Sequence, residues 1–174
     1  PTVGCALANL AITMSRRVSV NLNYTMSEPD VNYCIRDAGV KHVITSKKFI
    51  EKKPFKVDVP FVFLEDMKEQ VRSSDRLFAG VGAFALPASV LERLIGLKRV
   101  KADDPITAIY TSGSTGEPKG VLLSQHNISA TIDAANQIFQ IEDDDVVLGV
   151  VPIFHSLGYL AALWLPLCLT PKVV

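Results

Sequence analysis

Hydrophobic positions in the first third of the chain alternate between helical and strand spacing. Leu7, Leu10 and Met14 fall on one face of a helix, and residues 17–22 have the composition of a short β run. A second helix is expected after Ser27, because a serine in this position can cap the first free N–H groups of a helix. The pattern therefore predicts a helix, a strand and a second helix in this order.

The second helix is expected to end at Gly39, since glycine readily adopts the left-handed conformation that follows many helices. Residues 42–45 and 59–64 then have the composition of buried strands, with a short helix between them. Strands and helices thus alternate across residues 1–64. This order predicts βα units and a parallel sheet, which is an α/β architecture.

Residues 65–104 interrupt this alternation. They carry many charges, and only residues 90–95 show helical spacing, which stops near Gly96. We expect the rest to be an irregular excursion on the surface. Residues 80–85 read Gly-Val-Gly-Ala-Phe-Ala, which is the glycine spacing of a dinucleotide-binding turn, but no β run precedes them. A dinucleotide site is therefore not expected there.

The last third returns to a regular pattern. Residues 106–110 predict a strand, residues 120–123 predict another, and a loop rich in Gly, Ser and Thr joins them. A helix is expected to start near Ser124. Residues 146–151 have the pattern of a buried strand, and residues 172–174 have that of a further strand. The loop between the first two strands is the part that carries candidate chemistry.

Composition narrows the class of protein. The chain has 174 residues, 48% of them hydrophobic, so it is too apolar to be disordered and long enough for one domain. Its 18 basic and 18 acidic side chains balance, which argues against a nucleic-acid partner. Cys5, Cys34 and Cys168 lack CxxC spacing, which predicts reduced core thiols and no zinc site or disulfide framework.

The longest apolar stretch, residues 157–169, is broken by Pro166 and is shorter than the ~20 residues that a membrane span needs. The start of the chain also lacks the basic residues and small-residue cleavage pattern of a signal peptide. These features predict a cytoplasmic protein with at most peripheral membrane contact.

The loop at residues 110–120 reads Tyr-Thr-Ser-Gly-Ser-Thr-Gly-Glu-Pro-Lys-Gly. Its glycines let backbone N–H groups approach an anion, its hydroxyls add donors, and Lys119 adds a charge suited to phosphate oxygens. The pattern favours a phosphate site over an ordinary flexible Gly/Ser loop. It is not a Walker A loop, because Pro118 stands where that pattern needs glycine and Gly120 where it needs a hydroxyl.

Residues 111–120 closely resemble the signature loop of the adenylate-forming, or AMP-binding, superfamily, which includes acyl-CoA synthetases. Residues 152–158, Pro-Ile-Phe-His-Ser-Leu-Gly, look like the motif that begins the acyl-binding wall of that family. Residues 20–25, 37–41 and 121–127 fit it as well. The resemblance implies the parallel-sheet-containing part of the family's large N-terminal domain. Within the family, the chain is most similar in style to fatty acyl-CoA or acyl-carrier-protein synthetases.

The resemblance implies an acid–thiol ligase that uses ATP and Mg²⁺. A carboxylate, expected to be a fatty acid, attacks the α-phosphorus and gives an acyl-adenylate and pyrophosphate. The thiol of coenzyme A or of an acyl carrier protein then displaces AMP. The catalytic residues implied are Lys119 and His155, with His155 positioning the acyl carboxylate, and no metal ligand is assigned. The residues implied to hold the β- and γ-phosphates are Thr111, Ser112, Gly113, Ser114, Thr115, Gly116 and Lys119.

On this basis residues 1–174 are a partial N-terminal AMP-binding domain: βα units at 1–64, the irregular excursion at 65–104, and the phosphate loop and acyl-pocket wall at 105–174. The family's magnesium-binding Glu, its ribose-binding Asp and its C-terminal domain have no counterpart here. We therefore expect a fragment that is inactive in isolation. The alternatives are a non-catalytic nucleotide-binding remnant and another ATP-using enzyme, such as a kinase or hydrolase. Residues 157–169 fit either the wall of an acyl tunnel or a plain core helix.

Overall fold

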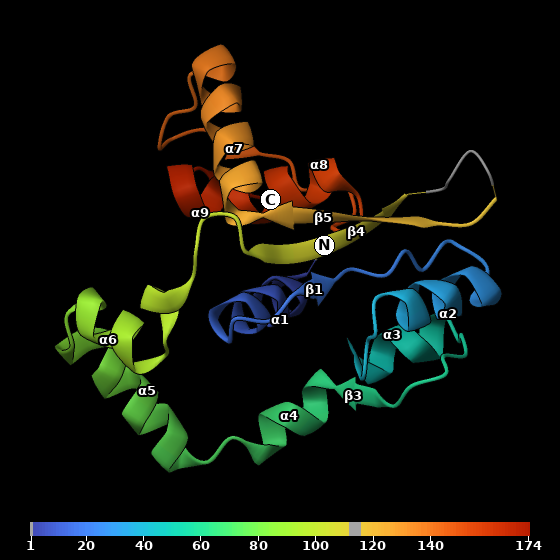
Figure 1. Ribbon diagram of the computed structural model, residues 1–174. Helices are drawn as coiled ribbons and strands as arrows, with labels where there is room; N and C mark the ends of the chain where they lie inside the picture. Colours follow the sequence, from blue (N-terminus) through green and yellow to red (C-terminus); the bar gives the residue numbers. More distant parts are fainter. Residues whose placement is uncertain (1, 112–115) are drawn as a thin grey trace.

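The computed structural model describes residues 2–111 and 116–174, and its central element is the strand β4 (Figure 1). A three-stranded sheet joins β4 in parallel to β1 and in antiparallel to β5. Two further sheets are parallel pairs, β2 with β3 and β6 with β7. The α/β architecture with parallel strands is thus confirmed. The strands are β1 (Ser19–Val20), β2 (Val43–Thr45), β3 (Phe61–Phe63), β4 (Pro105–Thr111), β5 (Lys119–Ser124), β6 (Val146–Val147) and β7 (Lys172–Val173).

Four of the helices outside residues 65–104 begin after a capping side chain, from Thr2, Ser27, Ser46 and Ser124. Ser27 accepts a hydrogen bond from the N–H of Asp30, and Ser124 accepts one from the N–H of Asn127. Gly39, with a φ of 63°, follows the second helix, as predicted. These helices are α1 (Val3–Met14), α2 (Glu28–Asp37), α3 (Lys47–Lys52), α7 (Gln125–Phe139), α8 (Ser156–Tyr159) and α9 (Leu165–Leu169), with the π-helical segment η2 (Leu160–Trp164) between the last two.

The hydrophobic core lies on both faces of β4. On one face Ala108 and Tyr110 cluster with Cys34 of α2. On the other, Ile109 packs with Ile128 of α7 and with residues of α8 and η2. In Figure 1 the β4–β5 hairpin accordingly runs between α1 and α2 on one side and α7 to α9 on the other. Burial on both faces explains why this strand reads as a nearly continuous apolar run.

Residues 90–95 lie mostly in a helix, as their spacing indicates, but the rest of residues 65–104 is not irregular, so that part of the sequence-based prediction was wrong. Residues 65–104 contain most of α4 (Leu64–Gln70), all of α5 (Ser73–Ala85) and α6 (Ala88–Leu94), and the short 3-10 turn η1 (Leu97–Arg99). Two glycines inside α5, which usually weaken helices, hid its helical spacing. The glycine pattern of residues 80–85 therefore lies within a helix, as expected for a segment that is no dinucleotide-binding turn. No side chain of residues 65–104 is buried, which confirms the surface location.

The expected buried strand at residues 146–151 is shorter and more exposed than predicted. Only Val146 and Val147 pair with β7, and Val146, Leu148 and Val150 are 58%, 66% and 64% exposed. The alternate residues are half-buried. This alternation belongs to a strand that is covered on one face, so an apolar run alone did not distinguish one covered face from two.

The three cysteines carry free thiols in different surroundings. Cys34 is 2% exposed, and burial raises the pKa of its thiol to about 11. Cys5 is half-buried and Cys168 is exposed. The prediction of core thiols is therefore correct for Cys34 and wrong for Cys168.

Residues 156–169 form one helical segment with a π-helical stretch in its middle. Pro166 has no N–H to donate, which favours a departure from α-helical bonding in the preceding turn. Tyr159, Leu163 and Leu165 are buried, whereas Leu157 and Leu167 are 61% and 50% exposed, so one face of this segment packs on the core. No helix among residues 2–111 and 116–174 is both long and apolar enough to cross a membrane.

Candidate functional site

The β4–β5 hairpin frames the predicted phosphate loop. Its last pair joins Thr111 to Lys119, and the Thr111 hydroxyl donates to the Lys119 carbonyl oxygen at 3.5 Å. Lys119 itself is exposed, and its position at the end of the hairpin presents its charge to solvent. Ser112, Gly113, Ser114 and Thr115 lie outside the described residues, so their phosphate contacts stay a prediction. The hairpin places both flanking residues of the loop side by side.

Two glycines of the loop region are required by geometry. Gly116 has a φ of 106°, a conformation that residues with a Cβ rarely adopt. Gly120 lies opposite Tyr110 across the hairpin, and a Cβ at this position would lie 2.9 Å from Cζ of the tyrosine ring. The ring of Tyr110 thus occupies the space that any other residue at position 120 would need.

The ring of Tyr110 is held from the other side by α2. Its hydroxyl donates to Oδ2 of Asp37 at 2.6 Å, and burial together with this hydrogen bond raises the pKa of Tyr110. The negative charge of Glu117, in the loop, is the main cause that raises the pKa of Tyr33 on α2. Tyr110 of β4 and Glu117 of the loop therefore both interact with residues of α2.

Replacing Gly120 with Ala should destabilise the chain by about 1–2 kcal/mol, because the anchored ring of Tyr110 must move to admit a methyl group. Chemical denaturation would measure this cost. In the background Tyr110→Phe, which lacks the hydrogen bond to Asp37, the ring can shift more freely and the cost should fall. Equal costs in the two backgrounds would contradict this account.

His155 lines a cavity of about 320 Å³ beside the hairpin. Its imidazole is exposed and packs against the ring of Phe154, with the centroids 4.6 Å apart, so it is not a core histidine. Thr111, the residue before the loop, lines the same cavity. The wall is otherwise mainly apolar. The full lining is Asn23, Met26, Ile109, Tyr110, Thr111, Val121, Leu123, Phe154, His155 and Ser156.

A buried hydrogen-bond network fixes the turn that carries His155. The Tyr159 hydroxyl lies 3.3 Å from Oγ of Ser19, which donates to Oγ1 of Thr107 at 3.2 Å, and all three residues are buried. Tyr159 also donates its N–H to the carbonyl oxygen of His155 at 2.8 Å. The turn is thus tied directly to β1 and β4, and its position follows that of the central sheet.

The structure brings together part of the predicted site. Thr111 and His155 share the cavity, whereas Gly116 and Lys119 are not among its lining residues. Asn23 and Met26 line it and were not predicted. The ring of Tyr24 packs edge-on against Phe154 with the centroids 5.1 Å apart, a contact between segments 130 positions apart that no local pattern announces. Among the described residues no group of three His, Cys, Asp or Glu side chains could hold a metal ion.

Comparisons with known proteins agree with this architecture. The chain is 30% identical over 158 residues to 4-coumarate–CoA ligase 5 of Oryza sativa subsp. japonica, covering 88% of this chain and 28% of the relative. It is 27% identical to a long-chain-fatty-acid–CoA ligase of Rattus norvegicus, covering 95% of this chain and 26% of that protein. The chain thus spans about a quarter of the length of these relatives.

Solved structures share the fold. The O-succinylbenzoate coenzyme A synthetase of Bacillus subtilis, in complex with AMP, superposes with a TM-score of 0.76 at 22% identity, over 100% of this chain and 40% of that one. The family model of the AMP-binding enzymes matches residues 2–174. With this match over nearly its whole length, the chain belongs to the AMP-binding enzyme family, the adenylate-forming superfamily.

Proposed function

We propose that the chain is part of a ligase that activates a carboxylic acid with ATP and transfers the acyl group to a thiol. The observation that carries this proposal is the cavity shared by Thr111, which leads into the phosphate loop, and His155, which begins the predicted acyl wall. The carboxylate must contact the α-phosphate of ATP before it can react. A cavity between these two elements is a suitable place for that contact.

The residues present fit a polyphosphate. Gly116 allows close backbone approach, and Lys119 offers an exposed charge at the hairpin end. In the proposed site residues 111–116 and Lys119 hold the β- and γ-phosphates and stabilise departing pyrophosphate. ATP with Mg²⁺ supplies the leaving group, and a related synthetase has been solved in complex with both. The acid needs no general base, because a carboxylate is already ionised at neutral pH.

His155 orients the acid in this proposal. Its ring borders a mainly apolar cavity, and the Tyr159 network holds its backbone in place. A mainly apolar wall with a few polar groups suits a carboxylate with a hydrophobic chain. We propose a fatty acid as the substrate and coenzyme A or an acyl carrier protein as the acceptor. The acyl-wall role of residues 157–169 is part of the same proposal, although these residues do not line the cavity.

A pyrophosphate-exchange assay on the full-length gene product tests the reaction. Labelled pyrophosphate should enter ATP only when a suitable acid is present, and fatty acids should support more exchange than 4-coumarate or O-succinylbenzoate. Release of ADP or inorganic phosphate without exchange would instead favour a kinase or hydrolase. ATP binding without turnover would favour the nucleotide-binding remnant.

The same assay on residues 1–174 alone tests the proposal that this chain is a fragment without activity of its own. The phosphate loop and the His155 turn are present, whereas the family's ribose-binding and magnesium-binding segments have no counterpart here. We expect exchange from the full-length product and none from the chain. Robust acid-dependent exchange by the chain would overturn the proposal.

A further inference from the structure

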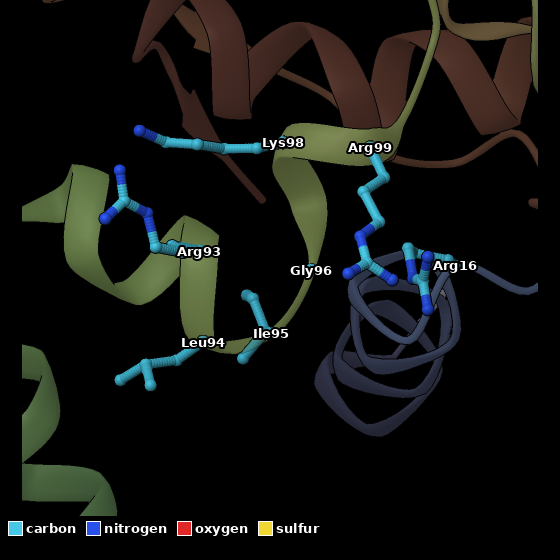
Figure 2. A pocket seen from close by; sticks show the side chains of 7 residues that line it. All are labelled: Arg16, Arg93, Leu94, Ile95, Gly96, Lys98 and Arg99. Carbon is cyan, nitrogen blue, oxygen red and sulfur yellow. The ribbon is translucent and has the colours of Figure 1, made fainter.

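A second pocket lies between the end of α1 and the α6–η1 segment, and none of its lining residues belongs to the phosphate loop. It has a volume of about 290 Å³ and four basic side chains in its lining. Figure 2 shows the Arg99 side chain pointing toward Arg16, with Arg93 and Lys98 extending together on another side. The pocket is lined by Arg16, Arg93, Leu94, Ile95, Gly96, Lys98 and Arg99.

The four cations of this pocket have no acidic partner within the part of the chain that the structure describes. The ion pairs found there join Arg36 to Asp58 and Lys47 to Asp66, on other elements. Like charges that share one pocket repel each other. The C-terminal ends of α1 and α6 lower this repulsion through their partial negative charge, but neither supplies a full counter-charge. The pocket therefore has the electrostatics of an anion site.

Arg16 stands at a position where the backbone conformation usually takes glycine. Arg16 follows α1 with a φ of 56°, and its N–H donates to the Thr13 carbonyl oxygen while that of Arg17 donates to Ile12. This is the helix-ending arrangement that normally takes glycine at the position of Arg16. The backbone conformation at this position is strained for arginine and relaxed for glycine. In return, arginine supplies a charged side chain, which glycine lacks.

The opposite wall is shaped to receive that side chain. Gly96 ends α6 with a φ of 78°, and a Cβ on it would lie 3.4 Å from both Cζ and Nε of Arg16. The guanidinium therefore packs against the backbone of the α6–η1 turn. Two left-handed residues, one on each segment, bring Arg16 next to the other cations of the pocket.

We propose that this pocket binds an anion of the phosphate class, a phosphomonoester or pyrophosphate group, at a site separate from the phosphate loop. Four positive charges exceed what a single carboxylate can balance, whereas a phosphate group carries up to two negative charges and several acceptor oxygens. Guanidinium groups match these oxygens with paired donors, and three of the four cations are arginines. The phosphate belongs either to a soluble ligand or to a lipid headgroup.

The test is a titration of the ¹⁵N-labelled chain with inorganic pyrophosphate, followed through backbone amide signals. The signals of Gly96, Lys98 and Arg99 should shift on binding, and they report on this pocket independently of Gly116 in the phosphate loop. Arg16→Gly should weaken the response of the pocket roughly tenfold in Kd and leave that of Gly116 unchanged. Glycine suits the backbone at position 16, so this variant should fold.

Arg76→Gln is the matched control, because it removes an exposed charge on α5 that does not line the pocket, and it should leave the Kd unchanged. Raising the salt concentration should weaken binding to the unsubstituted chain. A parallel arm uses vesicles of phosphatidic acid, whose headgroup is a phosphomonoester, and of phosphatidylcholine. Shifts with pyrophosphate support a soluble ligand, and shifts only with phosphatidic acid support a headgroup. No shift in either arm, or equal weakening by both variants, would overturn the proposal.

Discussion

Replacing Gly158 with Ala should destabilise the chain by about 3 kcal/mol, one of the largest effects expected of a single added methyl group. A Cβ on Gly158 would lie 2.2 Å from the carbonyl oxygen of Pro152 and 2.6 Å from that of Val151. Both obstacles are backbone atoms, so no side-chain rotation relieves the clash. The turn that carries His155 must move away from the first turn of α8.

Urea unfolding followed by circular dichroism would measure the effect as a lower midpoint at an unchanged slope. Gly80→Ala is the matched control, because no atom lies within 4 Å of a Cβ at this position inside α5. That variant should be neutral or more stable by about 0.5–1 kcal/mol, since alanine favours a helix over glycine. If Gly158→Ala unfolds at the midpoint of the unsubstituted chain, the close packing of this turn is refuted.

Gly158 also shows what the sequence can and cannot predict about the site. The Pro-Ile-Phe-His-Ser-Leu-Gly motif was recognised by its resemblance to a family, and the structure supplies a physical reason for its last residue. Gly120 is a similar case, since its need for glycine depends on the ring of Tyr110 across the hairpin. Contacts of this kind join residues that are not neighbours along the chain. A sequence motif therefore shows that glycine stands at such a position but does not show which contact requires it.

Local signals located most elements. Ser27 and Ser124 cap the expected helices, and the expected strands at residues 106–110 and 120–123 became β4 and β5. These features depend on neighbours three or four positions away, so sequence reasoning can find them. The spacing of residues 90–95 located α6, whereas α4 and α5 were missed because few of their side chains pack on a core and because Gly80 and Gly82 interrupt the pattern of α5.

Long-range geometry was beyond local reasoning. The cavity brings Asn23 and Met26 together with residues 154–156, and no pattern in either segment indicates that the two lie close together. The basic pocket likewise unites Arg16 with the turn around Gly96, 80 positions later. The first contact depends on how β1 and β4 pair, and the second depends on where α6 ends. The pairing of Ser19 with Thr107 is the register on which the cavity depends.

Replacing Lys119 with Ala in the full-length gene product should lower acid-dependent pyrophosphate exchange by ~10²–10³-fold. Lys119 closes the hairpin with an exposed side chain, so its charge is available to a polyphosphate while its backbone keeps the pairing with Thr111. Pyrophosphate gains negative charge as it leaves, and a fixed ammonium group stabilises that charge most in the transition state. The loss should therefore appear mainly in kcat, with unfolding midpoints unchanged.

Lys48→Ala is the control for this experiment, because Lys48 is an exposed lysine on α3 and lines neither pocket. It should exchange pyrophosphate at the unsubstituted rate. Lys119→Arg keeps a positive charge and should recover part of the activity, since the charge itself carries most of the effect. A Lys119→Ala protein that folds normally and exchanges within threefold of the unsubstituted enzyme would remove Lys119 from the proposed site. The loop would then hold its anion through backbone N–H groups and hydroxyls, for which Gly116 and Thr111 provide the flanking geometry.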